Sequence, residues 1–367
     1  MYNPYQLQEE FKQVEHGKSR IAAIRSAIRQ ADENHDLMYQ LAFRLELCYE
    51  SLFYDDAMDM LIVFPEALAL IDEHPDIPTT PNLKGYKNGM DRLLEVYKWL
   101  VGHCADFYQV SYQDCMNFFE DFKQRCLAFG YNLKPYYKAL YFFYDVIDKE
   151  YAKECFLKYR KLPTDGNGDC KACDRNTQIE YYLKTDNLKK ANQLAVDIEN
   201  FTLSCRGRGS VESWLRLKAN YMQYYIRKKD YAEAEKYIHQ MEPKQVNCEK
   251  TEYDYWNDYL HCYAYTDIGK ALRIYKEQWK EEQEQRCPAT RCYMDECIYV
   301  FFRELAKHQK SGTIKLDLDS SFPLYAEDGI YQIADMQAYY YNSAKEIAQK
   351  FDQRNGNHYY QNELSLL

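Results

Sequence analysis

The sequence predicts an all-α protein, a right-handed solenoid of antiparallel helical hairpins that repeat about every 37–43 residues. Three observations lead to this prediction. Apolar side chains recur at steps of three and four residues, and one hairpin pattern returns several times along the chain. Glycine and proline number only 13 and 10 among 367 residues, which leaves few points where long helices would be interrupted.

The clearest hairpin is predicted between Val211 and Met241. Apolar residues follow helical spacing on both sides of Lys229-Asp230, where the pattern is interrupted. Two amphipathic helices joined by a tight turn give this pattern. Pro243 is expected to end the second helix, because proline has no backbone N–H to continue helical hydrogen bonding.

A small residue marks the same position in four successive copies of this pattern. The copies carry Ala152, Ala191, Ala234 and Ala271, which are separated by 39, 43 and 37 residues. A small side chain at this position allows the two helices of a hairpin to approach closely. A repeat of this length is typical of a solenoid, in which each repeat contacts its neighbours.

The hairpin around Ala234 resembles the tetratricopeptide-repeat (TPR) family. The family's first-helix aromatic residue, inter-helix turn, small packing residue, second-helix apolar residue and closing proline match Tyr225, Asp230-Tyr231, Ala234, Ile238 and Pro243. The resemblance covers about residues 131–285, although the period exceeds the 34 residues usual for the family. Across the whole chain, the C-x2-C pair, a later cysteine and the tail sequence FDQRNG are similar to bacterial TPR proteins of unassigned function.

Three regions are expected along the chain. Residues 1–130 should form degenerate helical hairpins, and residues 131–310 should form the TPR-like repeats, with a turn-rich loop at 163–174. Residues 311–367 should hold an irregular loop, with room for one short strand pair, and a final helix over 332–351 that caps the array. Terminal repeats need such a cap because one face has no neighbour to cover it.

The charge balance and the chain's first residues restrict the partners and the location. The net charge of −10 disfavours nucleic acid and anionic membrane surfaces, because like charges repel. The N-terminal residues lack the charged and apolar regions of a signal peptide, and the longest apolar stretch is shorter than the roughly 20 residues that span a bilayer. A soluble, cytoplasmic protein is therefore expected, with no nucleic-acid or membrane partner.

Three cysteines form the sharpest candidate site. Cys170 and Cys173 have the C-x2-C spacing just before one predicted hairpin, and Cys205 lies just after it. Because a hairpin returns the chain to its starting end, the three sulfurs can converge. A structural zinc ion, a redox-active pair and three unliganded thiols are the open interpretations. Candidates for a fourth zinc ligand are Asp169, Asp174 and Cys248.

The resemblance also implies a binding surface. In the TPR family the first helix of each hairpin lines a concave groove that receives peptides or helices. The alanine register carries these groove positions to Tyr137, Tyr141, Tyr144, Asn176, Glu180, Arg216, Gln223, Arg227, Tyr253, Trp256 and Tyr263. Tyr, Trp and Arg often dominate binding energy, whereas Tyr at helical spacing also serves packing between repeats.

The leading functional hypothesis is a scaffold or adaptor that binds a protein or peptide in its concave groove. One alternative is a zinc- or redox-responsive repeat protein that uses the three cysteines, and another is a regulator that senses a peptide. An enzyme is not expected, because the sequence contains no complete GxxxxGK[ST] phosphate-binding loop, no HExxH and no GxSxG motif. No cofactor is expected apart from the possible structural zinc.

Overall fold

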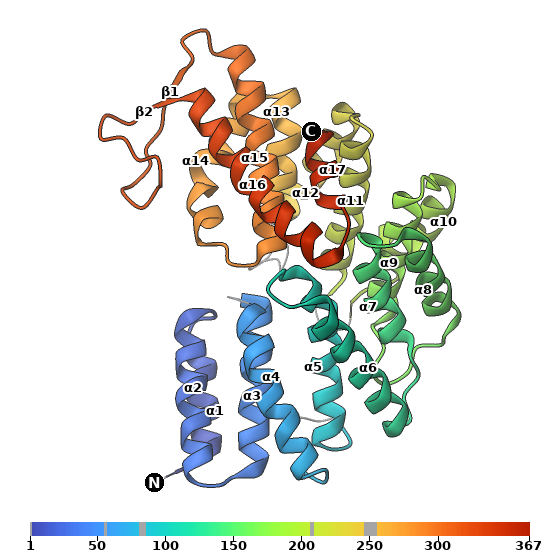
Figure 1. Cartoon of the computed structure of the whole chain (residues 1–367). Helices are drawn as coiled ribbons and strands as arrows, with labels where there is room; N and C mark the ends of the chain where they lie inside the picture. The colour runs from blue at the N-terminus through green and yellow to red at the C-terminus, as the bar shows by residue number, and fades with distance from the viewer. Residues whose placement is uncertain (1, 55–56, 81–85, 206–208, 246–254) are drawn as a thin grey trace. The chain divides into compact units, whose positions relative to one another are not determined.

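The computed structural model describes residues 2–54, 57–80, 86–205, 209–245 and 255–367. These residues form two compact units that divide after Gly168, and each unit is described by itself. Helices dominate both units (Figure 1), which confirms the predicted all-α class. Within the described ranges, none of the helices combines the length and the apolar character that crossing a bilayer requires.

The first unit, residues 1–168, consists of eight α-helices and one 3-10 turn in its described part. These are α1 (Pro4–Gln13), α2 (Lys18–Glu33), α3 (Leu37–Tyr54), α4 (Ala57–Glu73), α5 (Gly89–His103), the 3-10 turn Cys104–Asp106, α6 (Tyr112–Phe129), α7 (Lys134–Asp145) and α8 (Lys149–Lys161). Consecutive helices pack against one another, and α5 also packs against α3 and α7. Aromatic side chains fill this core, including the fully buried Phe43, Phe64, Tyr97, Phe119 and Phe122.

The second unit, residues 169–367, holds the remaining elements. These are α9 (Lys171–Lys184), α10 (Leu188–Glu199), α11 (Gly209–Arg227), α12 (Tyr231–Gln245), α13 (Trp256–Thr266), α14 (Ile268–Glu284), α15 (Pro288–His308), β1 (Thr313–Lys315), β2 (Ile330–Gln332), α16 (Ile333–Asn355) and α17 (Tyr359–Ser365). The two short strands pair antiparallel, with Ile314 opposite Tyr331. The predicted irregular segment with one strand pair is therefore present, and the helix after it is longer than expected.

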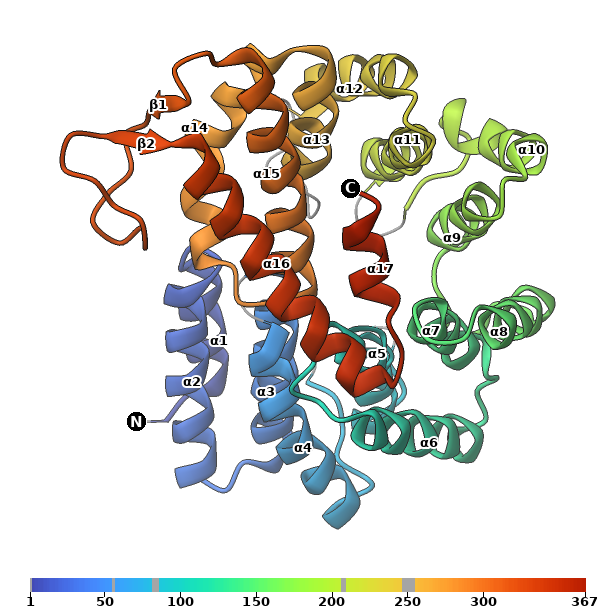
Figure 2. The ribbon, with the colours of Figure 1, turned by 45° about the horizontal axis from the view of Figure 1, so that its top comes forward.

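The helices of the second unit form two layers. The helices α9, α11, α13 and α15 pack against one another in chain order, and each also packs against the helix that follows it. We call these four the first helices and α10, α12, α14 and α16 the second helices. Figure 2 shows α9 and α11 side by side, with α10 next to α9 and α12 next to α11.

Each hairpin from α7 to α14 begins its second helix in the same way. An Asp or Asn side chain accepts a backbone N–H of the first turn and so caps the helix; these residues are Asp148, Asn187, Asp230 and Asp267. Four positions after each cap comes a buried alanine; these are Ala152, Ala191, Ala234 and Ala271. The close helix contact predicted at these alanines is consistent with their burial.

The two compact units divide after Gly168, inside the turn-rich segment, so the α7–α8 hairpin lies in the first unit. The predicted change from degenerate to TPR-like repeats at residue 130 stays a prediction. Pro243 lies within α12, which continues to Gln245. Near the end of a helix, proline removes only one of the last hydrogen bonds, so the helix can extend a little further.

The buried alanine of the α11–α12 hairpin provides a test of close helix packing. We expect Ala234→Leu to lower the free energy of unfolding by about 1–3 kcal/mol, because the larger side chain must displace well-packed neighbours. Urea denaturation followed by circular dichroism measures this change. Ala232 is exposed on the same helix, so Ala232→Leu is the matched control and should change stability by less than about 0.5 kcal/mol. Equal effects of the two substitutions would contradict the close contact.

Candidate functional site

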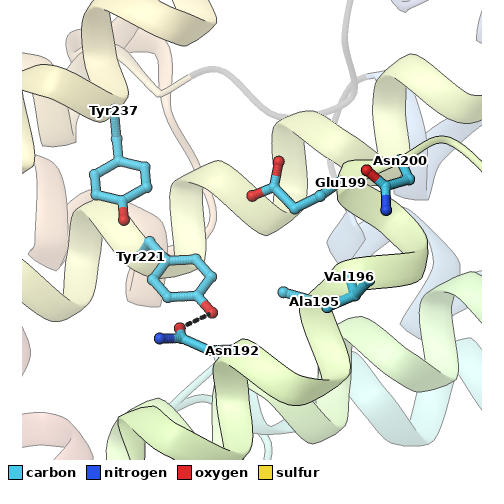
Figure 3. A pocket seen from close by; sticks show the side chains of 7 residues that line it. All are labelled: Asn192, Ala195, Val196, Glu199, Asn200, Tyr221 and Tyr237. Atoms are coloured by element: carbon cyan, nitrogen blue, oxygen red, sulfur yellow. Dashed lines mark hydrogen bonds between the residues drawn. The ribbon is translucent and has the colours of Figure 1, made fainter.

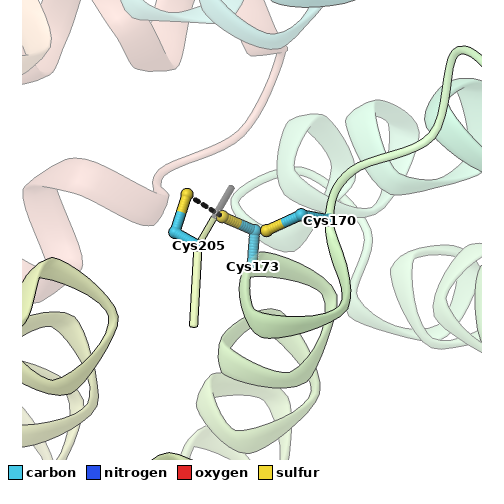
Figure 4. A group of neighbouring side chains, drawn as sticks. All are labelled: Cys170, Cys173 and Cys205. Atoms are coloured by element: carbon cyan, nitrogen blue, oxygen red, sulfur yellow. Dashed lines mark hydrogen bonds between the residues drawn. The ribbon is translucent and has the colours of Figure 1, made fainter. Parts of the chain in front are cut away.

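The three predicted cysteines converge at one end of the α9–α10 hairpin. Cys170 caps the N-terminus of α9, Cys173 lies in its first turn, and Cys205 follows α10 on the way to α11. Their sulfur atoms all lie within 4.8 Å of one another, and the sulfurs of Cys173 and Cys205 are 3.8 Å apart. Figure 4 shows the three sulfurs close together, with that of Cys173 between those of Cys170 and Cys205. The predicted convergence is confirmed.

Backbone contacts hold Cys205 against the start of α11. Its N–H donates to the carbonyl of Gly209 at 3.1 Å, and the N–H of Gly209 donates back at 2.9 Å. The N–H of Cys205 also lies 3.0 Å from the hydroxyl of Ser213. The side-chain amide of Asn176 on α9 donates to the carbonyl of Ser213 at 3.0 Å. The cysteine cluster therefore sits where α9 and α11 are already joined.

The electrostatics of the cluster are those of crowded thiols. The pKa of Cys173 is raised well above the usual range, first by its hydrogen bond with Cys170 and then by burial and by the nearby Cys205. The positive charge of Arg216, on α11, acts in the opposite direction. Arg216 was predicted as a groove residue, and the structure places it next to the cysteines. In the absence of a cation, Cys173 therefore stays protonated at neutral pH.

Among the described residues, no His, Asp or Glu joins the three sulfurs as a ligand. The carboxylate of Asp174 instead accepts a hydrogen bond from the side chain of Gln178 at 3.2 Å, and Asp169 does not belong to the group. Cys248 lies outside the described residues. The protein groups described at this site therefore supply three donors and leave a fourth position open.

The predicted groove residues of α7 lie in the first unit. Tyr141 is fully buried and packs against Phe156 of α8, with 5.4 Å between ring centroids. The hydroxyl of Tyr144 lies 2.7 Å from that of Tyr112 on α6. Tyr137 is half-buried beneath the ammonium group of Lys158. All three side chains therefore take part in packing between neighbouring helices.

In the second unit, α9 and α11 present most of their predicted groove residues at the surface. Glu180 is half-buried and pairs with Lys184 at 3.0 Å. Gln223 is half-buried, and Arg227 is exposed one helical turn further along α11. Asn176 is the exception, since it is buried in the contact with α11.

The predicted positions that lie on α13 are buried, and one of them, Tyr263, contacts the second helices. Trp256 and Tyr263 are both buried, and the hydroxyl of Tyr263 donates to Glu242 of α12 at 3.1 Å. Lys270 of α14 lies over the ring of Tyr263. Tyr253 falls outside the described residues. Different residues of α13 therefore face the neighbouring first helices.

Asp258 is the residue of α13 that connects three first helices. Its buried carboxylate accepts hydrogen bonds from Gln223 of α11, at 3.1 Å, and from the hydroxyl of Tyr293 of α15. Burial raises the pKa of Asp258, whereas the two hydrogen bonds and the charge of Arg227 oppose the shift. The network joins α11, α13 and α15 through one carboxylate.

One turn further along α13, a histidine and a cysteine meet in the interior. Nδ1 of His261 lies 3.9 Å from the sulfur of Cys297 on α15, and both residues are buried. Burial and the charges of Arg303 and Lys229 lower the pKa of His261 to about 4, while burial raises the pKa of Cys297. Both groups are therefore neutral at pH 7, unlike the thiolate that a nucleophilic cysteine needs.

A second buried polar group joins α14, α15 and α16. The guanidinium group of Arg291 pairs with Glu282 and with Asp295, and the hydroxyl of Ser343 donates to Asp295 at 2.6 Å. Burial, followed by the charge of Asp295, raises the pKa of Glu282. Two carboxyl groups and one guanidinium group thus share one site, and retention of a proton limits the repulsion between them.

A hollow of about 310 Å³ opens between α10, α11 and α12, and no sequence motif indicated it. Figure 3 shows the rings of Tyr221 and Tyr237 and the side chains of Asn192 and Glu199 around it. The hydroxyl of Tyr221 donates to Asn192 at 2.7 Å. These residues come from three different helices, and no sequence spacing links one helix's residues to those of the next, so only the fold brings them together.

No protein-family model and no curated protein matches this chain.

The buried carboxylate of Asp258 predicts a distinct dependence of stability on pH. Its raised pKa means that the folded protein binds a proton more tightly than the unfolded chain. As pH rises from 3.8, the ordinary pKa of an aspartate, through the raised pKa of folded Asp258, ionisation of this carboxyl group lowers the free energy of unfolding. We expect Asp258→Asn to remove this loss and so to increase the free energy of unfolding at pH near 7.

Chemical denaturation of both proteins across the acidic and neutral range measures the difference. The advantage of Asp258→Asn should be largest at neutral pH and should shrink below a pH of about 4, where wild-type Asp258 is protonated in both states. Asp317 is exposed in the connection before α16, and Asp317→Asn serves as the control. A variant that loses stability equally at every pH would contradict the assigned cost of ionisation.

Proposed function

We propose that the second unit binds a segment of a partner protein along its first helices. The binding face is defined by Gln223, Arg227, Tyr265, Tyr293 and Arg303, which come from α11, α13 and α15. Arg227 is exposed, and Tyr265 and Tyr293 are each 37% exposed. We call this surface the first-helix face.

Contacts of the chain's own tail carry this proposal. Lys229 donates from its ammonium group to the carbonyl of Leu366 at 3.5 Å, and the guanidinium group of Arg303 donates to the carbonyl of Leu367. Arg303 also donates to the hydroxyl of Tyr265 at 2.5 Å. A cation from the α11–α12 turn, Lys229, and one from α15, Arg303, thus bind the backbone of a short peptide segment at the edge of the first-helix face.

The side chains of the face suit a polar peptide segment. The chain carries a net charge of −10. The first-helix face nevertheless holds Arg227 and Arg303 beside two half-exposed tyrosines, and Lys229 adds a positive charge at its edge. Arginine and tyrosine are enriched among residues that dominate binding energy, because each offers a large contact area and directed hydrogen bonds. Local positive charge favours a partner segment that presents carboxylates or backbone carbonyls.

The network at Asp258 supports binding by keeping the face in place. Gln223 and Tyr293 are both hydrogen-bonded to the same buried carboxylate, so their spacing is fixed before a partner arrives. A preorganised surface loses less conformational entropy on binding than a mobile one. The face thus offers a partner a rigid centre with the exposed Arg227 beside it.

In this proposal the chain is a helical-repeat scaffold, with TPR-like hairpins that continue as a right-handed solenoid and a cytoplasmic location. The layering of first and second helices in the second unit supports it, as does the repeated cap and alanine of four hairpins. No catalytic step is assigned to the chain. The proposal needs only that first helices present side chains to a partner while second helices pack behind them.

The exposed Arg227 gives the sharpest test of the first-helix face. A photo-crosslinking amino acid at position 227 should capture a partner from a lysate of the native cells, and the captured protein can then be purified for titration. We expect Arg227→Ala to weaken its binding by about tenfold, or about 1.4 kcal/mol, because an anchoring arginine at an interface is lost.

Arg273 is the matched control, because it is equally exposed but lies on the second helix α14. Arg273→Ala should leave the affinity unchanged, and a crosslinker at position 273 should not capture the same protein. Equal capture from both positions, or equal weakening by both substitutions, would show that the partner does not use the first-helix face.

A further inference from the structure

The spacing of the three sulfur atoms matches that of thiolates around one zinc ion. Four ligands at the usual Zn–S distance of about 2.3 Å in a tetrahedron place neighbouring sulfurs about 3.8 Å apart. Cys173 and Cys205 are separated by 3.8 Å, and all three sulfurs fall within 4.8 Å of one another. Only small side-chain movements are needed to bring Cys170 to the same spacing.

The position of the cluster suits a negatively charged metal complex. Three thiolates and one Zn²⁺ carry a net charge of −1, which needs compensation in a half-buried site. Cys170 and Cys173 stand at the N-terminus of α9, where the backbone N–H groups favour negative charge. The guanidinium group of Arg216, on the neighbouring α11, adds a positive charge close to Cys173.

We propose that Cys170, Cys173 and Cys205 bind one Zn²⁺ ion through three thiolates and leave its fourth position to water. Each thiol releases its proton to solvent as its sulfur binds the metal, and no electron transfer is involved. The sulfurs are half-buried, so the fourth position is open to exchange with a ligand from solution.

The bound ion joins two successive first helices. Cys170 caps α9 and Cys173 lies in its first turn, whereas the backbone of Cys205 is hydrogen-bonded to Gly209 at the start of α11. Zinc at this position therefore fixes the distance between α9 and α11 and stabilises the second unit. This inference is independent of the partner-binding proposal, because the metal site needs no occupant on the first-helix face.

Titration of the reduced, chelator-treated full chain with Co²⁺ tests the site. Zn²⁺ has a filled d shell and is colourless, whereas tetrahedral Co²⁺–thiolate complexes absorb in the visible and near-ultraviolet ranges. We expect one Co²⁺ to bind per chain with thiolate absorption, and one Zn²⁺ to displace it. Added Zn²⁺ should also raise the melting temperature of the wild-type protein.

Substitution of the ligands must abolish this behaviour. Cys173→Ser and Cys205→Ser should each weaken Co²⁺ binding by at least about 100-fold, because even changes around a metal's ligands cost about 10–100-fold. Cys287→Ser is the matched control, since Cys287 is also half-buried in the second unit but lies outside the cluster. This variant should bind Co²⁺ and respond to Zn²⁺ as the wild type does.

Two further measurements can overturn the assignment. Added imidazole should change the Co²⁺ spectrum by replacing water at the fourth position, and an unaffected spectrum would show a closed site. Intact mass of the protein isolated without reductant should match reduced thiols with zinc. A disulfide between Cys173 and Cys205 in place of the metal, or equal Co²⁺ binding by Cys205→Ser and wild type, would refute the zinc site.

Discussion

The four hairpins from α7 to α14 depend on one repeated constraint, the contact of two antiparallel helices at a buried alanine. Each such alanine stands four residues after the Asp or Asn that caps its helix, as in the pairs Asp230 with Ala234 and Asp267 with Ala271. The cap fixes where the helix begins, and the alanine fixes how near its partner lies. Because the two signals have a constant separation, the start of a helix and its contact with the preceding helix are set together. Hairpins of different lengths can then follow the same packing rule.

This constraint places the polar groups of the second unit. When each second helix packs closely behind its first helix, successive first helices are left to contact one another. Their shared boundary carries the polar contacts, with Asn176 bonded to the backbone of Ser213 and with Gln223 and Tyr293 bonded to Asp258. Buried polar groups need partners to offset their desolvation. The first helices can therefore hold a fixed spacing only where these hydrogen bonds are made, and the face presented to a partner inherits that spacing.

Local signals in the sequence were sufficient for the hairpins and for the cysteines. The alanine period and the helical spacing of apolar residues predicted the hairpins from α7 to α14, and the return of one hairpin predicted the meeting of Cys170, Cys173 and Cys205. The facing residues of α13 were not predictable in the same way. Every residue from Trp256 to Ala264 is buried, so the helix has no apolar stripe from which its orientation could be deduced. The bond between Tyr293 and Asp258 joins residues 35 positions apart, and no local pattern encodes such a pair. The division after Gly168 likewise depends on contacts between helices, which a repeat period does not report.

The first helices are joined by two kinds of contact with different chemical sensitivities. At Asp258 the contact is a buried carboxylate held by two hydrogen bonds, and its strength depends on ionisation and on the packing around it. At the cysteines the contact consists of three sulfurs that lie close together as thiols and that would repel one another as thiolates unless a cation stood between them. The α11–α13–α15 spacing is thus set by the folded chain alone, whereas the α9–α11 contact, already joined by Asn176 and Ser213, would gain a further link from an ion under the proposed zinc site. Metal binding would affect the affinity of a partner segment bound across α9 and α11, but not that of a segment confined to α11, α13 and α15. The position of a partner along the first helices therefore decides whether metal binding and partner binding are coupled, because coupling requires that both ligands act on the same helix contact.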